Sequence, residues 1–218
     1  MATEREADRV SQDTVLVPGG RDVRATLDAR GGDACVVACP PHPQHGGSRT
    51  NPCLRAVSDA LGGGARPIDC LRFDYGPWDE GRGERADARN AVAWARERYD
   101  RVGLFGYSFG SAVALCEASE GLSVAAVSAL APPPGLTEHL DALGAMETLA
   151  ERSADGTAET PAVQVVYGER DDTVDWEPVV DVAREAGFKV DAVPGDHFFA
   201  GQAPKVGETV AAFLRERV

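Results

Sequence analysis

Residues 101–119 read RVGLFGYSFGSAVALCEAS, and this stretch decides the fold. The apolar run Arg101–Phe105 predicts a buried strand, and Phe109–Ser119 predicts a helix. Between them, Gly106-Tyr-Ser-Phe-Gly110 matches the G-x-S-x-G pattern, which holds a serine, here Ser108, in strained backbone geometry. Glycine is needed on both sides, because larger side chains two residues away from the serine would collide at such a sharp turn. The alternative interpretation of Ser108 is a purely structural turn.

Strand-like and helix-like segments alternate on both sides of this turn. Strands are predicted at residues 14–17, 22–28, 34–39, 68–73, 101–105, 123–130, 162–167 and 188–193. Helices are predicted at residues 52–61, 84–99, 109–119, 137–149, 178–186 and 206–217. The first two strands form a hairpin through Pro18-Gly19-Gly20, and the later crossovers predict an α/β fold. We expect a mostly parallel eight-stranded sheet with helices on both faces, in one domain spanning 1–218. The segment 131–160 is too short to form a large lid.

The composition excludes several classes of protein. The chain has 22 basic and 35 acidic residues and a formal net charge of −13, so binding to nucleic acid is not expected. No apolar run approaches the roughly 18–20 residues of a membrane span, and the charged N-terminus lacks a signal-peptide pattern, which favours a cytoplasmic protein. Only Lys189 and Lys205 are lysines. This composition is typical of salt-loving archaea, although a GC-rich genome also favours arginine over lysine.

The cysteines give no sign of a disulfide framework or a zinc site. Their number is odd and no C-x-x-C pattern occurs. They are Cys35, Cys39, Cys53, Cys70 and Cys116. Three of them lie in apolar strand-like stretches, so we expect buried thiols in a reducing compartment.

A serine hydroxyl becomes a nucleophile only when a base accepts its proton. His197 follows the last predicted strand, where it can approach Ser108 at the carboxyl edge of a parallel sheet. Two carboxylates, Asp171 and Asp172, follow the preceding strand and could orient this histidine. The order of serine, aspartate and histidine along the chain is the one associated with α/β-hydrolases.

Motifs along nearly the whole chain resemble the α/β-hydrolase superfamily, specifically its small lid-less branch related to dienelactone hydrolases. That branch carries a His-Pro-His-Pro-x-x-Gly-Gly loop after its third strand, and residues 40–47 read PPHPQHGG. Its Phe-Ser-Phe-Gly elbow corresponds to residues 107–110, its Gly-x-x-Asp-x-x-Val segment to 168–174 and its Asp-His-Phe-Phe segment to 196–199. Two positions depart from the pattern: Pro40 replaces the first histidine of the loop, and Tyr75 replaces the arginine that usually follows the fourth strand.

The resemblance and the order of the residues imply the same catalytic roles. Ser108 would attack an acyl carbonyl, and His197 would accept its proton and return it to the leaving group. Asp171 would fix the tautomer of His197, and the register of the motif favours it over Asp172. The nucleophile differs from the cysteine of dienelactone hydrolases proper, so their lactone chemistry is not expected here.

The oxyanion of the reaction would be held by two backbone N–H groups. Phe109 supplies one at the start of its helix, and the loop after the third strand supplies the other. His42 is the candidate in that loop, because Pro40, Pro41 and Pro43 have no N–H. His45 and His139 are expected to be surface or loop residues.

The predicted substrate is a small acyl compound, most simply a carboxylic ester. A thioesterase, a peptidase or an acyltransferase could use the same three residues, and a non-catalytic α/β-hydrolase scaffold is a further alternative. No metal or organic cofactor is predicted, because the histidines lack ligand spacing and no phosphate-binding glycine motif opens a helix. The sequence leaves the oligomeric state open.

Overall fold

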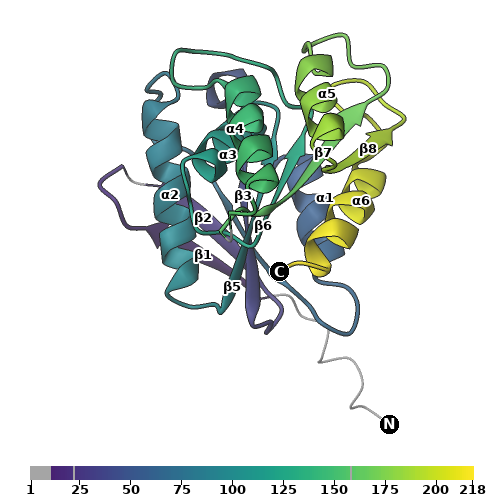
Figure 1. The fold of residues 1–218 in the computed structure, drawn as a ribbon. Coiled ribbons are helices and arrows are strands. Elements are labelled where there is room, and N and C mark those ends of the chain that lie inside the picture. Colours follow the sequence, from purple (N-terminus) through teal and green to yellow (C-terminus); the bar gives the residue numbers. More distant parts are fainter. Residues whose placement is uncertain (1–10, 22, 158) are drawn as a thin grey trace.

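The computed structural model describes residues 11–21, 23–157 and 159–218, and a twisted sheet forms its centre (Figure 1). Within these residues, eight strands lie in the order β1-β2-β4-β3-β5-β6-β7-β8. They are β1 (Ser11–Val17), β2 (Val23–Ala29), β3 (Ala34–Cys39), β4 (Asp69–Phe73), β5 (Arg101–Tyr107), β6 (Ala126–Leu130), β7 (Ala162–Gly168) and β8 (Lys189–Val193). Strand β2 is antiparallel to β1 and to β4, and the other neighbouring strands are parallel. The predicted fold class is confirmed. The charged N-terminal stretch and Asp22 lie outside the described residues.

Helices cover both faces of the sheet, as predicted (Figure 1). The helices of the first face are α2 (Arg82–Arg96), α3 (Phe109–Ser119), α4 (Ala142–Ala154) and α5 (Glu177–Glu185). Those of the second face are α1 (Pro52–Leu61) and α6 (Ala203–Arg215). Each face has its own apolar core, because the strands between the two layers bury side chains on both sides.

Helix α3 is the most deeply packed of these helices. All its residues from Phe109 to Ala118 are buried, because α3 lies between the sheet and the neighbouring helices α2 and α4. Helix α2 instead buries one face, which includes Ala88, Val92 and Ala95 as predicted. The start of α3, next to Ser108, is therefore held by a rigid and fully packed element.

The connection between β6 and β7 differs from the prediction. The helix predicted at residues 137–149 is wrong in its limits, because α4 begins only after Asp141, whose carboxylate accepts a hydrogen bond from the N–H of Gly144 over 3.0 Å. Thr137 and Leu140 pair in an isolated bridge instead. The strand predicted from residue 123 begins at Ala126. Helix α4 packs against α3 and α5 within the helical layer, so it does not form a lid.

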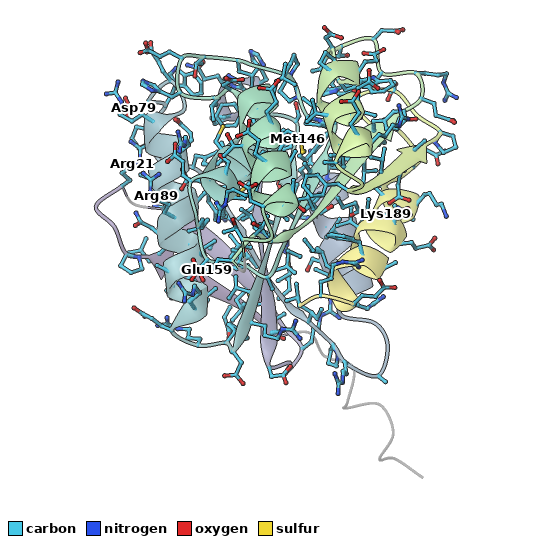
Figure 2. The ribbon with its side chains drawn as sticks, in the orientation of Figure 1. Arg21, Asp79, Arg89, Met146, Glu159 and Lys189 are labelled. Atoms are coloured by element: carbon cyan, nitrogen blue, oxygen red, sulfur yellow. The ribbon has the colours of Figure 1, made fainter. Side chains whose placement is uncertain are left out.

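The loop after β4, residues 74–81, is anchored to α2 by buried carboxylates. Arg21 lies beside α2 (Figure 2), where its Nε donates to Oδ1 of Asp87 over 2.9 Å. The other oxygen of Asp87 accepts from the N–H of Gly76 over 2.9 Å. The fully buried Glu84 accepts from two further N–H groups of the loop, each over 2.9 Å. These bonds fix the loop at the carboxyl edge of the sheet, where the candidate site lies.

Candidate active site

The turn between β5 and α3 has the strained geometry that the sequence predicts. Ser108 has a φ of +54°, a value that residues other than glycine rarely adopt. A Cβ on Gly106 would lie 2.1 Å from the carbonyl oxygen of Gly110, and a Cβ on Gly110 would lie 2.3 Å from that of Cys39. The two glycines are therefore required by close backbone contacts, and the turn projects Ser108 at the carboxyl edge of the sheet.

Three side chains from three loops form one chain of hydrogen bonds. The Oγ of Ser108 lies 2.9 Å from Nε2 of His197, and Nδ1 of His197 lies 2.7 Å from Oδ2 of Asp171. His197 follows β8, Asp171 follows β7 and Ser108 follows β5, so the carboxyl ends of these strands bring them together. Both His197 and Asp171 are buried. An arrangement of this kind can move a proton from the serine to the imidazole.

The environment of Asp171 distinguishes it from its neighbour. Its Oδ1 accepts hydrogen bonds from the N–H of Thr173 over 2.9 Å and of Val174 over 3.3 Å, which leaves Oδ2 for His197. The indole N–H of Trp176 donates to the backbone oxygen of Asp171. Asp172 is exposed. The geometry therefore supports the predicted choice of Asp171.

The loop that carries His197 is tied directly to the serine turn. The hydroxyl of Tyr107 donates to the backbone oxygen of His197 over 2.6 Å. Burial raises the pKa of Tyr107, so its hydroxyl stays protonated and available as a donor. This contact was not predicted from the sequence. Its only signal was the phenol next to Ser108, where the related branch has phenylalanine.

The two residues predicted as oxyanion donors lie close together. Phe109 is the first residue of α3, so its N–H has no acceptor within the helix. The rings of His42 and Phe109 lie 4.9 Å apart between their centroids, which places the loop after β3 beside the start of α3. Nδ1 of His42 accepts from the N–H of Gln44 over 3.2 Å. Burial and the nearby His45 lower the pKa of His42, so the neutral ring is favoured. Donation to an oxyanion stays a prediction for both residues.

A cluster of rings beside these donors was not foreseen from the sequence. The ring of Trp78 stacks on that of His42 at 4.6 Å and lies 5.7 Å from that of Phe109. Tyr75 packs edge-on against Phe109 at 5.5 Å, and its hydroxyl donates to the backbone oxygen of Pro40 over 3.3 Å. The two positions that depart from the related branch, Pro40 and Tyr75, are therefore in contact.

The remaining predicted residues lie apart from this hydrogen-bonded chain. His45 is exposed, and its ring stacks on that of His42 with 4.4 Å between the centroids. Nε2 of His139 lies 3.0 Å from a guanidinium nitrogen of Arg82. The five cysteines are free and buried, and burial raises the pKa of each thiol. Among the described residues, no three histidine, cysteine or acidic side chains are grouped to hold a metal ion. In the same part of the chain, no helix is long and apolar enough to cross a membrane.

Comparison with known proteins supports the fold. No protein-family model and no curated protein matches the sequence. A lid-less α/β serine hydrolase of Xanthomonas campestris is similar, with a TM-score of 0.74 and 22% identity over 95% of each chain. An α/β serine hydrolase homologue of Coxiella burnetii has a TM-score of 0.75 and 21% identity, over 94% of this chain and 97% of its own. An esterase of Pyrococcus furiosus has a TM-score of 0.70 and 19% identity, over 95% and 93%. The chain has the α/β-hydrolase fold without a lid, as predicted.

Proposed function

We propose that this protein is a serine hydrolase that cleaves carboxylic esters of small acids through an acyl-enzyme. The observation that carries the proposal is the continuous chain of short hydrogen bonds from Ser108 through His197 to Asp171. The strained conformation of Ser108 adds support, because such strain concentrates at functional sites. Structures that share the fold include proteins described as esterases.

In the proposed mechanism, Ser108 Oγ attacks the acyl carbonyl while Nε2 of His197 takes its proton. Asp171 holds the proton of the imidazole on Nδ1 and stabilises the cation that forms. The backbone N–H groups of Phe109 and His42 donate hydrogen bonds to the oxyanion of the tetrahedral intermediate and stabilise its charge. His197 then protonates the departing alcohol, and water repeats the sequence on the acyl-enzyme to release the acid and regenerate Ser108.

The same three residues could act on thioesters or amides, or could transfer the acyl group to another acceptor. A panel of esters, thioesters and amides that share one acyl group separates these activities. We expect turnover to be fastest on the esters. A scaffold without catalytic activity would hydrolyse none of them.

Labelling by a fluorophosphonate probe tests the nucleophile. The wild-type protein should react, and Ser108→Ala should lose both labelling and ester hydrolysis while keeping its melting temperature. Ser123→Ala is the matched control, because Ser123 is exposed and lies in a similar Gly-Leu-Ser-Val stretch that precedes a strand. If Ser108→Ala kept more than about a tenth of the activity, Ser108 would not be the nucleophile.

A further inference from the structure

The turn after β8 presents an apolar side chain to solvent beside the candidate base. Phe198 is 70% exposed, whereas the preceding His197 and the following Phe199 are buried. The backbone dictates this arrangement. The N–H of Phe198 donates to Oδ1 of Asp196 over 3.0 Å, and Phe199 adopts a φ of +51°. Phe199 is thereby directed inward, where it packs against the ring of Tyr107 at 6.0 Å between centroids.

Phe198 is therefore held outward by a built turn. The backbone oxygen of Asp196 also accepts a hydrogen bond from the N–H of Phe199 over 3.2 Å, so two hydrogen bonds to Asp196 stabilise this turn. A phenyl ring that is 70% exposed leaves most of its apolar surface in water, and burial of this surface by a ligand would be favourable.

The position of the Phe198 ring beside His197 determines which part of a substrate it would contact. The rings of Phe198 and His197 meet edge to face, with 5.6 Å between their centroids. In the proposed mechanism, His197 delivers its proton to the oxygen of the departing alcohol, so that alcohol must leave past the imidazole. Its carbon chain then lies beside Phe198. The acyl oxygen lies instead toward Phe109 and His42, at the start of α3.

We propose that Phe198 forms an apolar subsite for the leaving group, and that the preferred substrates are esters of aromatic or medium-chain alkyl alcohols. This inference rests on the proposed function. Without a lid, the fold has no second layer that could enclose the alcohol, so one exposed ring at the rim provides the apolar contact on this side.

The test compares acetate esters that differ only in the alcohol: ethyl, hexyl, benzyl and 2-hydroxyethyl acetate. The value of kcat/KM reports the steps up to departure of the alcohol, and the acetyl-enzyme is common to all four. In Phe198→Ala, kcat/KM for the benzyl and hexyl esters should fall by about five- to tenfold, mainly through KM. The ethyl and hydroxyethyl esters should change by less than about twofold, and Phe198→Leu should retain most of the preference.

Leu16→Ala is the control for general loss of exposed apolar surface, because Leu16 is 64% exposed on the edge strand β1. It should leave all four esters unchanged. An equal loss for all four esters in Phe198→Ala, or no loss for any, would overturn the subsite. So would a wild-type dimer that Phe198→Ala converts to a monomer in size-exclusion chromatography, because Phe198 would then contact a second copy. Failure of the proposed function is distinct, since the wild-type protein would hydrolyse no ester and take up no probe.

Discussion

Replacement of Asp171 by asparagine removes the charge of the candidate acid and keeps its shape. The amide oxygen can still accept from the N–H groups of Thr173 and Val174, so the loop has no reason to move. The amide nitrogen then faces Nδ1 of His197, at the position where the carboxylate oxygen lies 2.7 Å away. When Nδ1 accepts a hydrogen bond from this amide, the neutral imidazole carries its proton on Nε2. Nε2 can then no longer accept the proton of Ser108.

The magnitude follows from the cost of the productive tautomer. Keeping the proton on Nδ1 would set two donors face to face in a buried site, and each unsatisfied buried donor costs about 1–3 kcal/mol. The variant also loses the carboxylate that stabilises the imidazolium. We therefore expect kcat to fall by about 10³- to 10⁴-fold, comparable to the same change in serine proteases.

The assay is steady-state ester hydrolysis, with Asp172→Asn as the matched control. Both variants lose one negative charge, but Asp172 is exposed, and its replacement should change kcat by less than about twofold. Melting temperatures measured alongside should identify any variant that has unfolded. A larger loss in Asp172→Asn than in Asp171→Asn would show that the acid lies one residue further along the chain, and the reasoning from the hydrogen bonds would fail.

Three further predictions concern Tyr107, His42 and the net charge of the protein. Tyr107→Phe removes the hydroxyl that donates to the backbone oxygen of His197, so kcat and the rate of probe labelling should each fall by about tenfold with KM unchanged. Unchanged labelling with a lowered melting temperature would leave Tyr107 a purely structural role. Burial and the nearby His45 hold the pKa of His42 below its ordinary value of 6.5, so its imidazole binds a proton more readily in the unfolded chain than in the folded protein. The stability of the fold therefore decreases as the pH falls below about 6.5. His42→Asn keeps an acceptor for Gln44, and its melting temperature should fall less than that of wild type between about pH 7.5 and about pH 5.5; an equal fall would exclude this role of His42. The net charge of −13 predicts a melting temperature that rises from about 0.01 M to about 1 M KCl as repulsion is screened, and a flat profile would leave genome bias as the better explanation of the composition.

The sequence predicts the serine turn because its constraints are local. Gly106 and Gly110 must both lack a Cβ within five consecutive positions, so the requirement appears as a short pattern. The order of the strands then brings His197 and Asp171 to the same edge, and their place after successive strands is visible in the sequence. The sequence therefore predicts those features of the site that depend on local backbone geometry and on the order of the strands.

The ring cluster leaves no such pattern. The rings of Trp78 and His42 stack although 35 residues lie between them in the sequence. No short motif around either residue predicts this contact. The predicted limits of the helix at residues 137–149 were wrong for a different, local reason. The apolar residues from Thr137 onward favour a helix, but the carboxylate of Asp141 caps the chain later and decides where the helix begins. Side-chain contacts over long sequence separations thus shape the walls of the site, whereas local backbone chemistry places its reactive atoms.

Close backbone contacts between neighbouring loops explain how this site is held without a lid. Gly110 lies against the backbone of Cys39, and a Cβ on Gly168 would meet the backbone oxygen of Gly195 at 2.8 Å, so the loops that carry the candidate oxyanion donors, acid and base support one another. Preorganised dipoles and hydrogen bonds of this kind need no closure to become effective. A site without a lid, however, does not select a substrate by enclosing it. Selectivity must then come from side chains fixed at the rim, and Phe198, held outward by its turn beside His197, is placed to provide it.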